Sequence, residues 1–287
     1  MPELPEVEIV KQSLKKKIKN KKIIKVVVRN RNLRFKLQSD FEKNLTNRII
    51  NQISRIAKYL ILIFDNHKYC IIHLGMSGTI HLINKNQERE MTNLSFYQSK
   101  ILPKKHNHIE IIFSKFKIIY NDPRRFGFFK ILNNEHEFKS YFNKLGPEAL
   151  NDDFNIKYLK KNLKNKKKNI KNLLLDQKFV SGIGNIYANE ILFYSKINPK
   201  KKALKINYKQ INQLLKFSKK VLNLAIKFGG SSIKDFKNTK GSMGEFQKEF
   251  KVYEKDNEKC PRKKCNGKII KIFISNRSTF FCNSCQN

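Results

Sequence analysis

Two pairs of cysteines near the C-terminal end constrain the fold more than any other feature of the sequence. They are Cys260, Cys265, Cys282 and Cys285. Four thiolates at this spacing suit a tetrahedral Zn²⁺ ion, with each pair on a tight turn. The sequence therefore predicts one structural zinc ion and a β-hairpin with strands at Lys268–Ile274 and Thr279–Phe281. Two disulfides are the alternative, but nothing in the sequence indicates an oxidising compartment.

The charge balance favours a polyanionic partner. Lys and Arg number 61 and Asp and Glu 23, which gives a formal net charge of +38. An excess of this size is typical of nucleic-acid-binding proteins. Only ten of the basic residues are Arg, and the chain is rich in Lys, Asn and Ile. Codon drift in an A+T-rich genome is therefore an alternative source of part of the charge.

Neither a membrane segment nor a signal peptide is expected. The longest apolar run is Tyr59–Phe64, which is far shorter than the roughly 18 residues of a membrane helix. The N-terminus carries Glu3, Glu6 and Glu8 where a signal peptide has basic residues followed by apolar ones. We therefore expect a cytoplasmic, nucleoid-associated protein with no membrane partner.

Changes in hydrophobic periodicity divide the chain into domains. An apolar stripe predicts a helix over residues 5–18. Short β-branched and aromatic segments predict strands between residues 23 and 132, at Ile23–Val28, Ile53–Phe64, Tyr69–Leu74, Thr79–Ile83, Ile109–Phe113 and Phe116–Tyr120. We predict an N-terminal β-domain, a packed sandwich or a barrel, over 1–132, a linker over 133–153, a helical domain over 154–245 and a zinc hairpin over 246–287. A mobile loop is expected at residues 230–245.

The N-terminal residues carry groups that are suited to covalent catalysis. If Met1 is removed, the chain begins with the secondary amine of Pro2. An α-amino group has a pKa near 8, so much more of it is unprotonated at neutral pH than of a lysine. Such an amine can attack the anomeric carbon of a sugar and form a cationic iminium. Glu3 is close enough in sequence to act as the acid. Because Pro is common at position 2, an ordinary N-terminus remains the alternative at this point.

Motifs spread over nearly the whole chain resemble those of formamidopyrimidine-DNA glycosylases. The resemblance begins with Pro2–Glu8 and continues in the same order to the four-cysteine hairpin with Arg277. The intervening motifs are Ala57–Leu60, His73–Gly78, His106–His108, Asp122–Gly127, Leu145–Glu148 and Gly182–Ala188.

This resemblance implies an α+β fold and a bifunctional repair enzyme. The fold is a helix-flanked β-sandwich followed by a helix–two-turn–helix domain with a zinc hairpin. The activity is excision of 8-oxoguanine and formamidopyrimidines from duplex DNA by a monomer, with cleavage of the abasic site by β,δ-elimination. The alternatives are an endonuclease VIII-like enzyme for oxidised pyrimidines and a non-catalytic duplex-DNA-binding protein of the same fold. An RNA-binding zinc protein is a further rival.

The resemblance also implies roles for individual residues. Pro2 resembles the nucleophile, Glu3 the acid, Lys58 the lysine of β-elimination and Arg277 the arginine of δ-elimination. The residues that fill the gap left by an everted nucleotide match Met76, Arg124 and Phe126, with the arginine bonding the orphaned cytosine. The other expected DNA contacts are His106, Lys166, Lys171 and Asn185. The Cys-x4-Cys spacing of the first pair departs from the usual Cys-x2-Cys of the family, and residues 230–245 also diverge from the family pattern.

Overall fold

The computed structural model describes residues 2–84, 89–90, 102, 104–231 and 245–287. These residues form two compact units, which are treated separately. The first unit joins Met1–Asn143 with Phe228–Gln247, and the second joins Lys144–Lys227 with Lys248–Asn287. The chain therefore leaves the first unit after Asn143, builds most of the second unit, and returns to the first for Phe228–Gln247. It then ends in the second unit.

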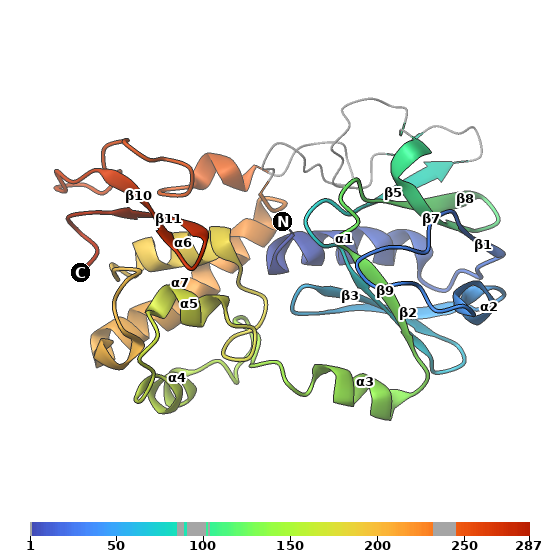
Figure 1. Cartoon of the computed structure of the whole chain (residues 1–287), viewed down its shortest axis with the longest axis horizontal. Coiled ribbons are helices and arrows are strands. Elements are labelled where there is room, and N and C mark those ends of the chain that lie inside the picture. Colours follow the sequence, from blue (N-terminus) through green and yellow to red (C-terminus); the bar gives the residue numbers. More distant parts are fainter. Residues whose placement is uncertain (1, 85–88, 91–101, 103, 232–244) are drawn as a thin grey trace. The chain divides into compact units, whose positions relative to one another are not determined.

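Two antiparallel sheets and one helix form most of the first unit (Figure 1). One sheet has the order β1-β7-β8-β5-β6. Its strands are β1 (Lys25–Val28), β5 (Thr79–Asn84), β6 (Arg89–Glu90), β7 (Asn107–Ile112) and β8 (Phe116–Asn121). The other sheet has the order β2-β3-β4-β9. Its strands are β2 (Ile50–Ile56), β3 (Tyr59–Phe64), β4 (Tyr69–His73) and β9 (Phe128–Leu132). The helical segments are α1 (Leu4–Ile18), α2 (Phe41–Leu45), η1 (Lys104–His106) and α3 (Glu135–Phe142).

One hydrophobic core joins α1 to both sheets. The apolar stripe of α1 contributes Val10, Leu14 and Ile18 to the core, where they meet residues of the four-stranded sheet such as Leu62 and of the five-stranded sheet such as Ile109. Pro5 lies in the first turn of α1, and three lysines lie in its last turn. Both arrangements suit a helix, because proline lacks the amide proton that the first turn leaves unbonded and the helix dipole favours cations at its C-terminal end. The helix-flanked sandwich expected from the sequence is confirmed.

Helices and a terminal hairpin form the second unit. Its α-helices are α4 (Ile156–Leu163), α5 (Ile170–Leu175), α6 (Asn185–Tyr194) and α7 (Tyr208–Lys227), with 3-10 turns η2 (Ala203–Lys205) and η3 (Phe246–Glu249), the last at the return to this unit. Asn155 and Asn169 cap α4 and α5 with their side-chain oxygens, which satisfies otherwise unbonded amides of the first turn. The hairpin pairs β10 (Ile269–Ile274) with β11 (Arg277–Cys282). Among the described helices, none is long and apolar enough to span a bilayer.

One expectation about local structure was wrong. The segment Ile53–Phe64, expected as one strand, is parts of two strands joined by a turn at Ala57 and Lys58. The segment 133–153, expected as a linker, contains α3, whose cap is Asn134. Residues 232–244 of the expected mobile loop lie outside the described residues. The domain bounds drawn from the sequence stay a prediction.

Candidate active site and DNA-contact residues

The N-terminal residues are held at the start of α1 by buried acids. Glu3 caps the helix and is 1% exposed. The carboxylate of Glu6 accepts a hydrogen bond from the Glu3 amide through Oε2 at 2.9 Å. Its Oε1 accepts hydrogen bonds from the amide and hydroxyl of Ser231, both at 2.9 Å. Pro2 thus precedes a fixed helix start rather than a loose end, while Met1 lies outside the described residues.

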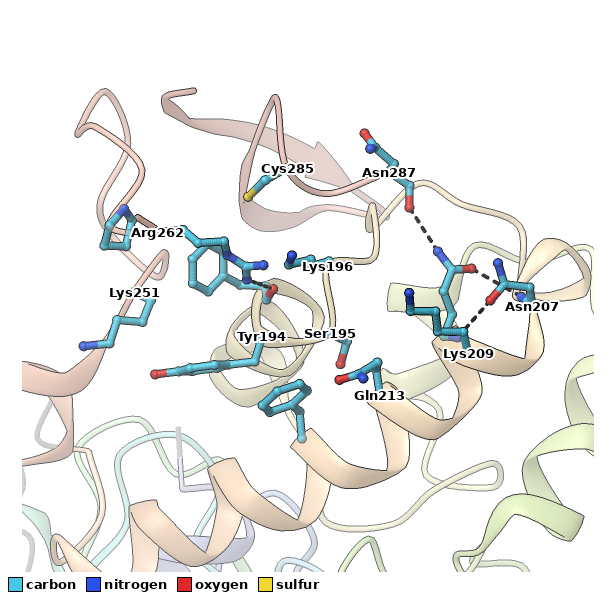
Figure 2. A pocket seen from close by; sticks show the side chains of 14 residues that line it. Tyr194, Ser195, Lys196, Asn207, Lys209, Gln213, Lys251, Arg262, Cys285 and Asn287 are labelled. Atoms are coloured by element: carbon cyan, nitrogen blue, oxygen red, sulfur yellow. Dashed lines mark hydrogen bonds between the residues drawn. The ribbon is translucent and has the colours of Figure 1, made fainter. Parts of the chain in front are cut away.

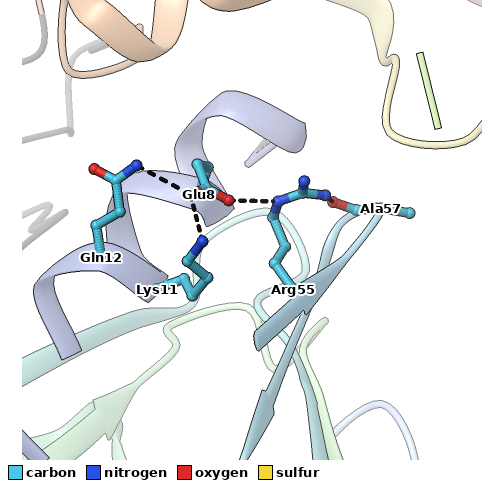
Figure 3. A network of polar contacts seen from close by, with 5 residues as sticks. All are labelled: Glu8, Lys11, Gln12, Arg55 and Ala57. Atoms are coloured by element: carbon cyan, nitrogen blue, oxygen red, sulfur yellow. Dashed lines mark hydrogen bonds and ion pairs between the residues drawn. The ribbon is translucent and has the colours of Figure 1, made fainter. Parts of the chain in front are cut away.

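Lys58 lies in the turn between β2 and β3, not on a strand, and a polar network connects this turn to α1 (Figure 3). Glu8 of α1 accepts from Arg55 Nε at 2.9 Å. Arg55 also donates through Nη1 to the carbonyl of Ala57 at 2.9 Å. Ala57 has a φ of 52°, in the left-handed region that L-residues seldom adopt. The network therefore fixes an unfavourable turn that carries Lys58 and links it to the helix that carries Pro2 and Glu3.

Glu8 remains an acceptor in this network. Burial raises the pKa of its carboxyl, but hydrogen bonds from Lys11, Gln12 and Arg55 outweigh burial and leave the pKa below its ordinary value. Lys11 Nζ lies 2.5 Å and Gln12 Nε2 3.0 Å from Glu8 Oε1. A carboxylate with donors on both oxygens is a stable anchor for the Arg55 guanidinium.

His73 lies at the end of β4 beside this turn. Burial, followed by the charges of Lys58 and Arg34, lowers the pKa of His73 to about 4. Its Nδ1 accepts a hydrogen bond from the Gly75 amide at 3.0 Å, and its ring stacks on Phe128 with centroids 5.5 Å apart. The imidazole is therefore neutral at physiological pH and presents its other nitrogen as a donor.

We expect the contribution of His73 to the free energy of unfolding to increase as pH rises from 4 to 6.5. In this window the unfolded imidazole binds a proton that the native imidazole does not, so the free energy of unfolding increases with pH. His73→Phe should flatten this increase, as measured by denaturant unfolding of both proteins between pH 4.5 and 7.5. An equal slope in the two proteins would show that the native imidazole is not kept neutral.

The three residues expected to fill the gap left by an everted nucleotide lie on two adjacent loops. Met76 is 37% and Phe126 42% exposed, and the Arg124 guanidinium lies over the Phe126 ring at 4.6 Å. Gly75 has a φ of 66°, and a Cβ atom there would lie 2.4 Å from the backbone of Phe126 and Gly127. The two loops are thus in direct backbone contact, with their large side chains exposed. We call Met76, Arg124 and Phe126 the gap-filling set.

The remaining expected DNA contacts differ in exposure. His106 ends η1 and is partly exposed, and Lys166 is exposed between α4 and α5. Asn185 begins α6, is half-buried, and donates through Nδ2 to the Ser278 carbonyl at 3.0 Å. His106 belongs to the first unit, together with the gap-filling set, whereas Lys166 and Asn185 belong to the second.

Lys171, also expected to contact DNA, differs from these residues in its burial. Its side chain is fully buried. Its Nζ donates to the Ser278 carbonyl at 2.9 Å and to Thr279 Oγ1 at 2.7 Å, both on β11. A buried ammonium needs such acceptors because desolvation would otherwise be too costly. Lys171 therefore supports the strand that begins with Arg277.

We expect Lys171→Met to destabilise the second unit by about 3 kcal/mol, because a charged donor is lost and its acceptors stay buried. Duplex affinity should fall while the slope of log affinity against log salt stays unchanged, since no phosphate contact is removed. Thermal unfolding and binding titrations at several salt concentrations would measure both effects. Lys166→Met, at an exposed lysine, is the control and should lower the slope by about 0.9 without loss of stability. A lower slope in the Lys171 variant would restore the DNA-contact interpretation.

Arg277 follows a tight turn at the tip of the hairpin. Ser275 and Asn276 form the two-residue turn, with φ values of 48° and 57°. Positive φ at both central residues is the type I′ geometry that matches the twist of paired strands. Arg277 is thus the first residue of β11, not a turn residue as expected, and its side chain is exposed.

The two cysteine pairs meet at the opposite end of the hairpin. Their sulfur atoms all lie within 4.8 Å of one another. The Sγ atoms of Cys260 and Cys285 are 3.8 Å apart, and those of Cys265 and Cys282 are 3.6 Å apart. Four sulfurs at about 2.3 Å from a tetrahedral ion would be about 3.8 Å apart. These four residues can therefore hold a metal ion, and the Cys-x4-Cys spacing does not prevent it.

A separate pocket of about 750 Å³ lies in the second unit and has Cys285 in its lining (Figure 2). Tyr194 and Phe217 stack within its lining, with centroids 5.6 Å apart. Its cationic residues are Lys196, Lys209, Lys251 and Arg262. Four basic residues among the fourteen that line the pocket are not unusual in a chain with 61 basic residues. The lining therefore does not single out a ligand, and of the residues expected from the sequence only Cys285 contributes to it.

Comparisons with known proteins cover both units. A family model described as the formamidopyrimidine-DNA glycosylase N-terminal domain matches residues 1–129, and one described as the H2TH domain of the same enzyme matches residues 145–237. A formamidopyrimidine-DNA glycosylase of Wolbachia pipientis subsp. Culex pipiens is 43% identical over 288 residues, which is 100% of both chains. One from Rickettsia bellii is 42% identical and covers 100% of this chain and 99% of its own.

Solved structures of similar proteins contain damaged DNA. A mutant Lactococcus lactis Fpg bound to DNA with Fapy-dG superposes with a TM-score of 0.88 at 35% identity, over all of both chains. The wild-type Lactococcus lactis protein bound to DNA with an oxidised pyrimidine gives 0.87 at 34% identity, also over all of both chains.

Proposed function

Because the chain belongs to the formamidopyrimidine-DNA glycosylase family, the DNA glycosylases that repair oxidised bases by base excision, we propose that it removes oxidised purines from duplex DNA and then cuts the abasic site. The substrates in this proposal are 8-oxoguanine and formamidopyrimidines. The observation that supports it most is a Pro2-Glu3 start held at a fixed helix terminus, with the Lys58 turn connected to the same helix.

The proposed chemistry begins at the N-terminal amine. The nitrogen of Pro2 forms a bond to the anomeric carbon, the glycosidic bond breaks, and the base leaves with a proton supplied through Glu3. The attached amine loses its proton, the bond from the anomeric carbon to the ring oxygen breaks as that oxygen takes up a proton, and an open-chain iminium forms. The resulting iminium acidifies the neighbouring carbon, so that loss of a proton there expels the 3′ phosphate. Lys58 serves this β-elimination, and Arg277 binds the phosphate and serves the δ-elimination.

One structural zinc ion completes the proposal. The sulfur separations fit a tetrahedral ion, and all four ligands would come from the protein, which leaves no open position for substrate. The ion supplies folding energy to the hairpin and takes no part in the chemistry. A monomer acting beside the nucleoid in the cytoplasm stays a prediction.

Borohydride trapping tests the proposed function. The protein is mixed with a duplex that carries 8-oxoguanine opposite cytosine, borohydride is added, and the attached peptide is identified by mass spectrometry. We expect an adduct on an N-terminal Pro2, which requires base loss, an iminium and removal of Met1. An adduct only with an oxidised pyrimidine would support the endonuclease VIII-like alternative. Tight duplex binding without any adduct would support the non-catalytic one.

We expect Arg277→Ala to weaken duplex binding and strand incision together. Removal of one phosphate contact should lower the salt slope of log affinity by about 0.9. Binding titrations from low to moderate salt, with incision measured in parallel, would show both effects. Unchanged affinity with an unchanged slope would exclude the phosphate contact. Lys271→Ala, at an exposed lysine of β10 in the same hairpin, is the matched control.

A further inference from the structure

A single buried carboxylate bonds to both loops that carry the gap-filling set. Asp122 is fully buried. Its Oδ1 accepts hydrogen bonds from the Ser77 hydroxyl and from the Arg124 amide, the latter at 3.3 Å. Its Oδ2 accepts from the Gly127 amide and from the Tyr120 hydroxyl, both at 2.9 Å. Ser77 directly follows Met76, so Asp122 holds the first loop with one oxygen and the second loop with both.

The contacts of Ser77 and of the Asp122 backbone extend the same junction. The Ser77 hydroxyl also accepts from the Arg124 amide at 3.2 Å, which joins the two loops directly. The Asp122 amide donates to the His106 carbonyl at 3.0 Å. His108 Nε2 lies 2.8 Å from the Asp122 carbonyl oxygen. Among the described residues, Asp122 forms no ion pair with a lysine or arginine, so neutral donors from these segments surround it.

Tyr120 keeps its proton in this arrangement. Burial and the neighbouring Asp122 hold the pKa of Tyr120 well above its ordinary value. Both carboxylate oxygens of Asp122 therefore accept hydrogen bonds only. The donors come from the first loop (Ser77), from β8 (Tyr120) and from the second loop (Arg124 and Gly127). Besides Asp122, the buried side chain of Ser77 joins the two loops through its bond from the Arg124 amide, whereas Met76 and Phe126 are exposed.

We propose that Asp122 is a positioning residue that makes the gap-filling set act as one rigid unit, and that it thereby sets the preference for the base opposite the lesion. The proposal rests on the proposed function, since it concerns an enzyme that everts a nucleotide. Replacing stacking and pairing by side chains is effective only if all three arrive together. Arg124 in particular can read the orphaned base only from a fixed backbone.

Asp122→Asn is the variant that tests this role. Asn has the same size, but one of its two polar atoms is a donor. Whichever way the amide turns, its NH2 group faces the backbone amide of either Gly127 or Arg124, and two donors cannot bond to each other. One hydrogen bond to the second loop is therefore lost without creating a cavity. Tyr120→Phe is the matched control, because it removes one hydrogen bond to the same carboxylate that comes from β8 and from neither loop.

Three substrates separate positioning from general damage. They are duplexes with 8-oxoguanine opposite cytosine, duplexes with 8-oxoguanine opposite adenine, and a single strand with a preformed abasic site. The single strand has no opposite base and needs no gap filled. For Asp122→Asn we expect excision opposite cytosine to fall at least tenfold and the cytosine-to-adenine ratio at least fivefold, with single-strand cleavage within twofold of wild type. Tyr120→Phe should stay within twofold on all three substrates.

The outcomes that would overturn the proposal are distinct from failure of the proposed function. Wild-type excision and an unchanged base ratio in folded Asp122→Asn would overturn it, as would equal losses on all three substrates. If Asp122→Asn does not fold, Ser77→Ala is tested in its place, since it removes the bond between the Ser77 hydroxyl and the Arg124 amide. An unchanged ratio of excision opposite cytosine to excision opposite adenine in that variant would overturn the proposal. If wild-type protein itself leaves 8-oxoguanine in place, the proposed function fails instead.

Discussion

Glu3→Gln and Pro2→Gly should each abolish excision of 8-oxoguanine while duplex binding persists. The amide of Gln cannot supply a proton, and positioned acids of this kind contribute roughly 10²–10⁴-fold to rate. A glycine amine forms an imine that is cationic only when protonated and lacks the ring that fixes its direction. We expect single-turnover excision to fall about a thousandfold in either variant, with equilibrium affinity within about threefold of wild type.

Glu8→Gln is the matched control for the acid. Glu8 lies on the same helix and anchors Arg55, but its donors already occupy both carboxylate oxygens. It should therefore keep a far larger part of the excision rate than Glu3→Gln. Excision by Glu3→Gln at the wild-type rate would mean that Glu3 is not the acid. A borohydride adduct on Pro2→Gly formed as fast as on wild type would show that the proline ring is not required.

Removal of the proposed zinc ion should cost the protein nearly all of its duplex affinity. A two-stranded hairpin is marginally stable alone, and the apolar cluster around it is small, with Phe193, Val252, Ile269 and Phe280 as its buried members besides two of the cysteines. Structural zinc contributes about 10–16 kcal/mol in isolated zinc fingers. We expect one zinc ion per chain, and at least a hundredfold weaker binding after chelation, because Arg277 is then no longer presented.

A cysteine outside the cluster provides the control for this experiment. Cys265→Ser should lose the ion and the affinity, whereas Cys70→Ala, in β4 of the other unit, should retain one zinc per chain. Metal content by a colorimetric indicator and affinity by titration would be measured on the same samples. Full affinity in a zinc-free protein would mean that the hairpin folds through its apolar cluster alone.

Regular patterns made most of the fold predictable. The stripe of α1, the β-branched segments of the sandwich and the cysteine spacing each depend on residues that are close in sequence, and each gave the correct element. The turn at Ala57 and Lys58 was missed because neither residue is a usual turn former. Its left-handed backbone is held by Arg55 and Glu8, a contact that spans 47 positions and leaves no local signal.

Long-range contacts also account for what was missed in the candidate site. Lys171 was expected as a DNA contact because it matches a position of the family pattern, and nothing near it in the sequence indicates that its side chain is buried. Its acceptors lie on β11, more than a hundred residues later. Asp122 falls within a motif that the sequence does single out, but nothing near it indicates that its partners include Ser77. Sequence patterns locate such residues and do not reveal which contacts they make.

The bonds from Ser231 to Glu6 have a consequence for synthesis of the protein on the ribosome. Glu6 is the sixth residue to be made and Ser231 is number 231 of 287. The sandwich strands can pair as soon as residue 132 has emerged, yet Glu6 lacks these bonds until four fifths of the chain exist. A nascent chain can thus fold its first core early, but the contacts of its N-terminal helix are completed only near the end of translation.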